Sequence, residues 1–368
     1  FAKIAGSNWL DTQTLEGLEK AWLTGNGANE IAVSNNSWGL YFDTDTSYED
    51  LMALGTSTLR DGKGRVYVFA AGNDRVSSGN ANLAYTLSNR YAIAVAGLKH
   101  DNTFAEYSSQ GSNILVSAYS GNFSDDSPTI GTTTVAGKAT TNITWSEDTL
   151  LDYTFAMNGT SSASPMVAAS VALVLEACPS LGWRDIKYLI AKHAKQIDNT
   201  NSSWIRNAVE LTHSIDYGFG LIDASEMIDD CTNSYTNLSA ELSHTVSQTY
   251  NRPIVDFTSE SFDISFPLDM TIEWVEVTID SDSTYASDYQ IELVSPLGTK
   301  TTLMSPIANP DIVQFNIGYY NWMSGGFRLS TTAMMGEASF GTWRVIVKDE
   351  LTGDEGTLKN IQLKVYGH

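Results

Sequence analysis

The hydrophobic periodicity of this chain changes once, near residue 231, and the change predicts two domains of different class. Before it, short apolar runs at 31–39 (IAVSNNSWG), 66–73 (VYVFAAGN) and 91–98 (YAIAVAGL) end in Ser, Asn or Gly, and 14–23 (TLEGLEKAWL) has apolar residues at helical spacing. Strand-like runs that alternate with helical patterns predict a mostly parallel sheet with crossover helices. Residues 1–231 are therefore expected to form an α/β domain.

Residues 232–368 show a different pattern. Segments such as SFDISFPL, TIEWVEVTID, YQIELVSPLGTKTTL and GTWRVIVKD alternate apolar and polar residues, with turns between them. This pattern is typical of an all-antiparallel β-sandwich. The length of the chain is also that of about two domains. We therefore predict a boundary within DDCTNSYTN, which gives domains 1–231 and 232–368.

Composition restricts the partners and the compartment. The formal net charge of −22 argues against nucleic acid or an anionic membrane as a partner, because both require a basic face. No apolar run approaches the roughly 18 residues that span a bilayer, so we expect no membrane span. The chain begins at Phe1 without the regions of a signal peptide, so we expect a processed product. Cys178 and Cys231 form either one disulfide or two buried thiols, and the sequence leaves both open.

The segment NGTSSASP (158–165) has the pattern of a nucleophilic serine at the start of a helix. Gly159 can take a tight-turn conformation that a side chain resists, and Pro165 suits the first turn of a helix that begins near Ser162. Ser161 would then lie at the positive end of this helix, where backbone N–H groups favour a developing oxyanion. The alternative is that these hydroxyl residues only cap a buried helix.

Two other segments follow apolar runs and indicate the same site. In FAAGND, Asn73 lies at a strand end, where its side chain can donate a hydrogen bond toward Ser161. In SNNSWG, Ser37 and Trp38 precede Gly39, which leaves room for a substrate backbone. Each segment alone is more often a simple turn. Together they matter because the loops at the carboxyl ends of parallel strands lie at one edge of the sheet.

Taken in order, these segments resemble the subtilisin-like serine peptidases, and more narrowly the kexin and furin branch. The resemblance continues through GTSSASPMVAASVALVLEACPSLGWRDIKYLI, with WRD at 183–185, and through YGFGLIDA at 217–224. The segments VEVTIDSDSTYASDYQIELVSPLGTKTTL and FGTWRVIVKDELTGDEGTLKNIQLKVYG are similar to the P-domain, the β-jelly-roll that follows the catalytic domain in proprotein convertases. Together these segments cover nearly the whole chain.

The resemblance implies a secreted serine endopeptidase that acts on proteins or peptides, with a P-domain that stabilises the catalytic domain. It implies that Ser161 is the acyl-enzyme nucleophile and that Asn73 is the side-chain donor of the oxyanion hole, beside the Ser161 backbone N–H. The substrate groove implied by the resemblance comprises Ser37, Trp38 and Gly39, which pair with extended substrate, and Ala71 and Gly72, which form a wall of the S1 pocket.

The sequence departs from the family at the catalytic triad. The family order is Asp, then His, then Ser, and the first two motifs are absent here. The only histidine before Ser161 is His100, which we interpret as a solvent-facing loop residue. We therefore expect an amino-terminal segment of the same protein to supply Asp and His, and the chain alone to be nearly inert. Two alternatives remain: a non-catalytic binding protein that retains the substrate groove, and a structural or adhesive exoprotein.

A second departure concerns the residue that precedes the cleaved bond. Convertases that cut after paired basic residues line S1 with carboxylates, and the matching positions are neutral here. A basic preference and a broad or apolar preference therefore both remain open. The positions concerned are Leu40, Tyr41 and Phe42, followed by Asp43 and Asp45, and in a second segment Asn82 and Leu83.

Calcium is a candidate structural cofactor without an assigned site. The carboxylate pairs at 43/45, 125/126 and 280/282 are of a kind that more often lies in solvated loops than around a metal. By the resemblance, an acidic ligand is expected in EYSSQG, where this chain has Ser109.

Overall fold

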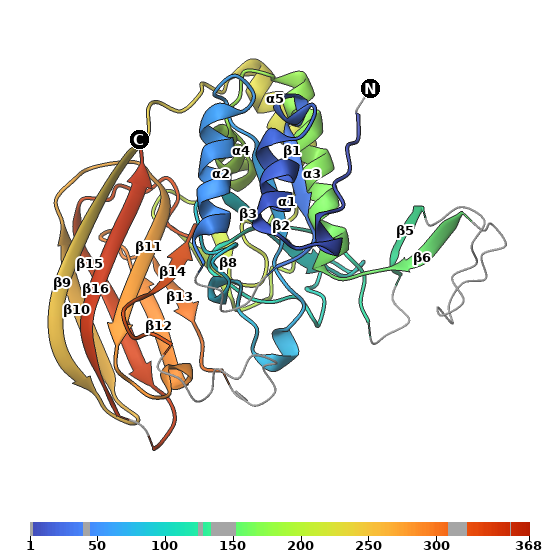
Figure 1. Cartoon of the computed structure of the whole chain (residues 1–368). Coiled ribbons are helices and arrows are strands. Elements are labelled where there is room, and N and C mark those ends of the chain that lie inside the picture. The colour runs from blue at the N-terminus through green and yellow to red at the C-terminus, as the bar shows by residue number, and fades with distance from the viewer. Residues whose placement is uncertain (1–2, 40–44, 124–127, 134–151, 308–321, 354) are drawn as a thin grey trace.

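The computed structural model of the chain describes residues 3–39, 45–123, 128–133, 152–307, 322–353 and 355–368. An α/β domain and a β-sandwich lie side by side (Figure 1). The first contains a parallel sheet with helices and the second contains antiparallel sheets. The predicted fold class, an α/β domain followed by an all-β sandwich, is confirmed. The predicted S1 residues Leu40, Tyr41, Phe42 and Asp43 and the carboxylate pair 125/126 lie outside the described residues.

A four-stranded parallel sheet forms the centre of the α/β domain. Its strands are β1 (Val33–Asn36), β2 (Val66–Ala70), β3 (Ala92–Leu98) and β4 (Ile114–Tyr119), in that order across the sheet. Every residue of β2 and β3 is buried, as is usual for parallel strands covered on both faces. β1 lies at one edge of this sheet.

Two groups of helices cover the two faces of the sheet. Val66 and Val68 of β2 pack in the core with α3, α4 and α5, whereas Tyr67 and Phe69 pack in a second core with α1, η2 and α2. This division follows from the period of two along a strand. The helices are α1 (Leu15–Glu19), the π-helical turn η2 (Lys20–Thr24), α2 (Ser47–Thr58), α3 (Thr160–Ala177), α4 (Trp183–His193) and α5 (Ala224–Asn233).

Helix α3 begins earlier than the sequence predicts. It starts at Thr160 with Gly159 as its N-cap, so Pro165 lies in the second helical turn rather than the first. By length and composition alone, α3 is also apolar enough to cross a membrane, which is weak evidence for a span, and 44% of it is buried within the protein. Its packing against the parallel sheet is that of a core helix.

The second domain consists of two four-stranded antiparallel sheets, with strand orders β10-β15-β12-β13 and β14-β11-β16-β9. Its core contains the fully buried Phe262 and Trp343. The strands are β9 (Leu242–Ile254), β10 (Ser259–Phe266), β11 (Ile272–Ser281), β12 (Tyr289–Val294), β13 (Lys300–Met304), β14 (Phe327–Thr331), β15 (Gly341–Asp349) and β16 (Gly356–Gly367).

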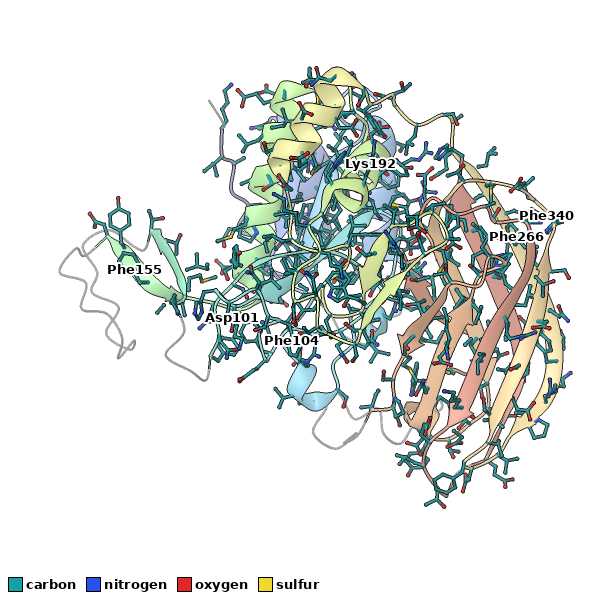
Figure 2. The ribbon with its side chains drawn as sticks, turned by 180° about the vertical axis from the view of Figure 1, so that it is seen from behind. Asp101, Phe104, Phe155, Lys192, Phe266 and Phe340 are labelled. Atoms are coloured by element: carbon teal, nitrogen blue, oxygen red, sulfur yellow. A yellow bond between two sulfur atoms is a disulfide. The ribbon has the colours of Figure 1, made fainter. Side chains whose placement is uncertain are left out.

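Shorter elements complete the fold. The hairpin β5–β6 projects away from both domains, with Phe155 on its surface (Figures 1 and 2). It leads directly into the start of α3. The remaining elements are β5 (Ile130–Thr133), β6 (Tyr153–Met157), β7 (Trp204–Arg206), β8 (Thr212–Ser214) and the 3-10 turns Trp9–Asp11, Ala28–Glu30, Arg75–Ser77, Ala81–Leu83 and Ala286–Asp288.

Asn82 joins the two domains and does not line a substrate pocket. It is 0% exposed, its Nδ2 donates to the carbonyl of Leu303 at 3.0 Å, and its Oδ1 accepts from the backbone N–H of Ser330 at 2.9 Å. Leu83 and Tyr85 belong to the sandwich core. The placement of Asn82 and Leu83 near S1 was therefore wrong, because this turn is covered by the second domain.

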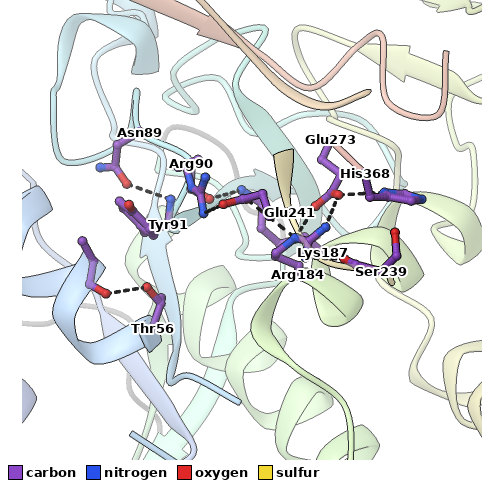
Figure 3. Close-up of polar contacts among 11 residues, drawn as sticks. Thr56, Asn89, Arg90, Tyr91, Arg184, Lys187, Ser239, Glu241, Glu273 and His368 are labelled. Carbon is purple, nitrogen blue, oxygen red and sulfur yellow. Dashed lines mark hydrogen bonds and ion pairs between the residues drawn. The ribbon is translucent and has the colours of Figure 1, made fainter. Parts of the chain in front are cut away.

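Charged groups form a second contact between the domains. The guanidinium of Arg184 on α4 makes two hydrogen bonds to the carboxylate of Glu273 on β11, and Glu273 also accepts from His368 at 2.8 Å. Arg90 pairs with Glu241 at 2.5 Å in the same cluster. Figure 3 shows these partners converging from both domains. The pairing satisfies charges that the domain contact partly buries.

Lys187 is buried at the centre of this contact. Its Nζ donates to the carbonyls of Arg90 at 2.6 Å and Ala92 at 3.2 Å, and it lies 4.3 Å from the ring centre of Trp274 on β11. Burial is the main cause that lowers the pKa of Lys187 to about 7, and the positive charge of Arg90 lowers it further. Glu273, Glu241 and the buried carboxyl of Glu276 oppose that shift.

The two cysteines form a disulfide. Cys178 caps α3 at its C-terminus and Cys231 lies in α5, with Cα atoms 6.3 Å apart. Of the two alternatives that the sequence left open, one disulfide or two buried thiols, the structure has the disulfide. It links the two helices and closes a long loop in the unfolded chain. Helix α5 continues to Asn233 and β9 begins at Leu242. The domain boundary at 231/232 stays a prediction.

The burial of Lys187 predicts a pH dependence of stability. Its folded pKa lies below its unfolded value, so between these two values the unfolded chain binds an extra proton and stability rises with pH. We expect Lys187→Met to remove a rise in the free energy of unfolding of about 1 kcal/mol per pH unit between about pH 7 and 9. Urea titrations at several pH values measure this slope in both proteins. Equal slopes would contradict a depressed pKa for Lys187.

Candidate active site

The backbone at Gly159 places Ser161 at the start of α3. Gly159 has φ 84° and ψ 159°, a conformation that residues with a side chain rarely adopt. Its N–H donates to the hydroxyl of Tyr107 at 2.8 Å. Burial raises the pKa of Tyr107, so its hydroxyl stays protonated. This hydroxyl donates a hydrogen bond to Ser120 Oγ at 2.7 Å. Ser161 is then the second residue of the helix, where a backbone N–H has no intrahelical acceptor.

Asn73 lies just beyond the end of β2 and is held by the first residue of α3. Its Oδ1 accepts two hydrogen bonds from Thr160, one from the backbone N–H and one from Oγ1, both at 2.9 Å. Thr160 Oγ1 in turn accepts from the N–H of Gly72 at 3.2 Å. With its oxygen fixed in this way, the Asn73 amide has its two N–H donors on the opposite side.

Two N–H donors converge on the space beside Gly159. A Cβ atom placed on Gly159 would lie 3.4 Å from Asn73 Nδ2, 3.6 Å from Asn73 Oδ1 and 3.7 Å from the backbone N of Ser161. Because Gly159 has no Cβ, this space stays open. The structure therefore places the Asn73 amide and the Ser161 backbone N on either side of one open space. Such an arrangement can stabilise a developing oxyanion.

Ser37 faces Ser161 across the end of β1. Its Oγ donates to the backbone carbonyl of Ser161 at 2.8 Å, and the Ser161 hydroxyl donates to the backbone carbonyl of Ser37 at 3.4 Å. Asn35 and Ser164 continue this network, with Ser164 Oγ donating to Asn35 Oδ1 at 2.7 Å. Neither residue was predicted from the sequence, although their positions beside the end of a strand and the start of a helix are a usable signal.

The other predicted groove residues differ in exposure. Trp38 is half-buried, with its ring 4.4 Å from that of Trp9 and 5.5 Å from that of Phe69. Gly39 is exposed, and no heavy atom would contact a Cβ placed there. The remaining two are Ala71, which is fully buried in the core, and Gly72, which is half-buried.

No base for Ser161 is present in the part of the chain that the structure describes. The hydrogen bond of its hydroxyl goes to a carbonyl, and no described histidine or carboxylate bonds to it. The histidines lie elsewhere: His100 in an exposed turn, His193 beside Asp230, His213 beside Ile114 and Thr332, His244 against Phe266 and His368 beside Glu273. Burial lowers the pKa of His213 to about 4, so it is neutral at physiological pH.

The surroundings of Ser109 do not fit calcium. Ser109 is fully buried, and its hydroxyl accepts from the N–H of Asp74 at 3.2 Å. The guanidinium of Arg75 lies in this region, pairing with Asp216 at 2.8 Å and approaching the carbonyl of Ser108 at 3.5 Å. A hydroxyl and a resident cation replace the anionic oxygen ligands that calcium prefers.

Both carboxylates of the predicted pair 280/282 accept hydrogen bonds from backbone N–H groups. Asp280 accepts from the N–H of Gly325 at 3.0 Å, and Asp282 accepts from that of Thr357 at 2.7 Å. Among the described residues, no group of three or more His, Cys, Asp or Glu side chains could hold a metal ion. A calcium site in this chain stays a prediction.

Comparison with known proteins assigns this chain to a family. The subtilase family profile matches residues 2–220, more than half of the chain. The chain belongs to the subtilase family. A second profile, the proprotein convertase P-domain, matches residues 272–365 in the sandwich. The resemblance to subtilisin-like peptidases of the kexin and furin branch is confirmed by these matches and by the relatives below.

Relatives of this subtilase include bacterial and eukaryotic proteases. An extracellular serine protease of Aeromonas sobria is 29% identical, covering 96% of this chain and 67% of that protein. Kexin of Saccharomyces cerevisiae is 27% identical over 86% of this chain, and human furin is 26% identical over 100% of it. The chain spans 37% of kexin and 45% of furin, which is less than half of each.

A solved structure supports the same assignment. The crystal structure of the serine protease of Aeromonas sobria matches this subtilase with a TM-score of 0.84 and 25% sequence identity, covering 97% of this chain and 75% of that chain. Both domains of this chain therefore have counterparts in one protease structure.

The conformation of Gly159 gives a stability prediction. Gly159→Ala would force a Cβ onto a backbone with φ +84° and fill the space between Asn73 Nδ2 and Ser161 N. We expect a loss of about 1 to 3 kcal/mol in the free energy of unfolding, measured by urea titration. Gly39→Ala is the matched control, because a Cβ there meets open space. An equal effect of the two substitutions would contradict a constrained turn at Gly159.

Proposed function

We propose that this protein is a secreted serine endopeptidase that cleaves peptide bonds through an acyl-enzyme on Ser161. One observation carries the proposal: Asn73 Nδ2 and the backbone N of Ser161 converge on the open space beside Gly159. A hydroxyl nucleophile next to two converging donors is what acyl transfer requires. A helix cap alone does not require a side-chain amide whose oxygen is tied back to Thr160.

In the proposed reaction, Ser161 Oγ attacks the carbonyl carbon of the peptide bond. The carbonyl oxygen becomes an oxyanion and receives hydrogen bonds from Asn73 Nδ2 and the Ser161 N–H. The C–N bond then breaks, the amine leaves with the proton that Ser161 gave up, and water releases the acyl group by the same steps in reverse order. These reaction steps need a base that accepts the proton of Ser161. The backbone carbonyl of Ser37 is too weak a base to accept it.

We propose that an amino-terminal segment of the same protein, not contained in this sequence, supplies the base and its carboxylate partner. The open edge of the sheet supports this. β1 pairs only with β2 among the described strands, and its residues are buried less than those of β2 and β3. Parallel strands usually occur in sheets that are covered on both faces, and an open edge is a template for another strand.

The outer face of α3 supports the same partner. Pro165, Ala169 and Leu173 are spaced by four residues, so they form one apolar stripe, and all three are exposed. Leu173 is 54% exposed. Helix α3 also packs beside β1, through the bond between Ser164 and Asn35. A segment that adds a strand to β1 would cover this stripe and bring its residues toward Ser161.

Secretion is supported by the disulfide between Cys178 and Cys231, because disulfides persist in oxidising compartments. The named extracellular protease among the relatives supports it too. A second candidate function, a binding protein that uses the groove without catalysis, is favoured by one observation: the Ser161 hydroxyl bonds to a carbonyl and has no described base.

Asn73→Asp tests the proposal in the protein that includes the amino-terminal segment. Aspartate keeps the oxygen that accepts from Thr160 but lacks the amide donor, so the fold should persist. We expect kcat for a peptide substrate to fall about 10²- to 10³-fold, the range known for loss of the corresponding Asn in subtilisin. Ser161→Ala is expected to abolish phosphonylation by a fluorophosphonate probe, in which the serine oxygen bonds to phosphorus and fluoride leaves.

The controls separate catalysis from folding. Asn102→Ala changes an asparagine in an exposed turn that bonds to Tyr119, away from Ser161, and should leave kcat unchanged. Thermal unfolding of each variant checks that it is folded. Full activity of Asn73→Asp would refute its role. A folded wild-type protein that neither hydrolyses peptides nor reacts with the probe would support the binding-protein alternative.

A further inference from the structure

A chain of three hydrogen bonds ends on the backbone carbonyl of Ser161. Ser164 Oγ donates to Asn35 Oδ1 at 2.7 Å, Asn35 Nδ2 donates to Ser37 Oγ at 3.1 Å, and Ser37 Oγ donates to the Ser161 carbonyl at 2.8 Å. The chain starts and ends on α3 and passes through the end of β1. The bond from Ser164 to Asn35 Oδ1 orients the amide so that one N–H of its Nδ2 points to Ser37 Oγ.

Pro165 explains why the Ser161 carbonyl needs an outside donor. In an α-helix, the carbonyl of residue 161 would accept the N–H of residue 165. Proline has no N–H, so this bond is missing from the start of α3. Ser37 Oγ fills the vacancy from outside the helix. Ser37 Oγ accepts a hydrogen bond from Asn35, so its single proton is available to donate to the Ser161 carbonyl.

We propose that Ser37 is a positioning residue that fixes the backbone of Ser161 through this carbonyl; the inference rests on the proposed peptidase function. The carbonyl bond sets the orientation of the first turn of α3, and with it the direction of the Ser161 N–H and side chain. The second contact, from Ser161 Oγ to the Ser37 carbonyl, is long at 3.4 Å. When a base draws the Ser161 hydroxyl away, this second contact breaks while the Ser37 Oγ bond remains.

A positioning role for Ser37 differs from the substrate pairing that the family resemblance implied. The sequence analysis assigned Ser37 to substrate pairing, which would act on the binding of substrate. A positioning role acts instead on the acylation rate at a given occupancy, because misplacement of a nucleophile raises the barrier without weakening binding. The two roles therefore predict different kinetic changes for the same substitution.

Ser37→Ala in the protein with its amino-terminal segment tests the role. We expect kcat to fall about tenfold, the rate equivalent of one hydrogen bond, with KM within about twofold of wild type. The pH profile should keep its midpoint, because Ser37 does not titrate with the base. Ser37→Thr keeps the hydroxyl and should retain most of the activity.

A second substitution offers a rescue that a general structural role does not predict. Pro165→Ala restores an N–H at position 165, which can donate to the Ser161 carbonyl from within the helix. We expect Ser37→Ala to cost much less in the Pro165→Ala background than in wild type, so the double-mutant cycle should be non-additive. Ser170→Ala is the matched control, because Ser170 Oγ bonds to the Met166 carbonyl on the same helix without reaching Ser161.

The kinetic results for Ser37→Ala in the two backgrounds either support or overturn the positioning role of Ser37. A tenfold fall in kcat with Ser37→Ala, reduced in the Pro165→Ala background, supports it. An unchanged kcat, or a rise in KM alone, overturns it and returns Ser37 to substrate binding. Equal losses in both backgrounds also overturn it. These results require a wild-type protein that hydrolyses peptides, so failure of the proposed peptidase function appears separately, as an inactive wild type.

Discussion

The bond between Asn73 Oδ1 and Thr160 is the contact on which the site depends. It connects the end of β2, a fully buried strand, to the first residue of α3. Because the oxygen of Asn73 is held, its amide N–H groups are aimed without a search for the right rotamer. The same contact fixes where α3 begins, and Gly159 lets the chain enter the helix beside that amide. The buried sheet thus holds the Asn73 amide, which we propose as an oxyanion donor, in a fixed position.

The second domain contacts the α/β domain close to this arrangement. Its strands cover the 81–85 turn, which lies only a few residues beyond Asn73, and Asn82 bonds to backbone groups of that domain. The Arg184–Glu273 pair and buried Lys187 tie α4 to β11 on another part of the contact. Much of this interface is buried polar surface with partners on both sides. Removing one partner of such a contact leaves the other buried and unpaired, so we expect loss of the sandwich to destabilise the α/β domain.

Sequence patterns predicted the layers of the fold better than its contacts. Fully apolar runs identified β2 and β3 because parallel strands are buried on both faces, and alternation identified β10, β11 and β15. β9 was not predicted, since it is an edge strand with mostly exposed polar residues. The disulfide was left open because sequence spacing does not give the distance between two cysteines.

In the site, too, the sequence predicted which residues lie there better than it predicted their contacts. The sequence predicted that Ser161 and Asn73 lie close together, because each follows a strand or turn pattern and the loops after parallel strands lie at one edge of the sheet. Asn82 was misplaced because it was matched to an S1 position through the family resemblance, and only the packed second domain shows what it bonds to. Pro165 was assigned to the first turn, whereas the helix begins at Thr160. That shift of a few residues changes its meaning, since a proline in the second turn removes a hydrogen bond from the nucleophile's own carbonyl.

The most direct measurement is a crystal structure of the protein with its amino-terminal segment, after reaction with a peptidyl phosphonate. We predict a covalent bond to Ser161 Oγ and a phosphonyl oxygen about 2.7 to 3.1 Å from both Asn73 Nδ2 and the Ser161 backbone N. An adduct whose oxygen points to solvent, or no adduct on Ser161, would contradict the account.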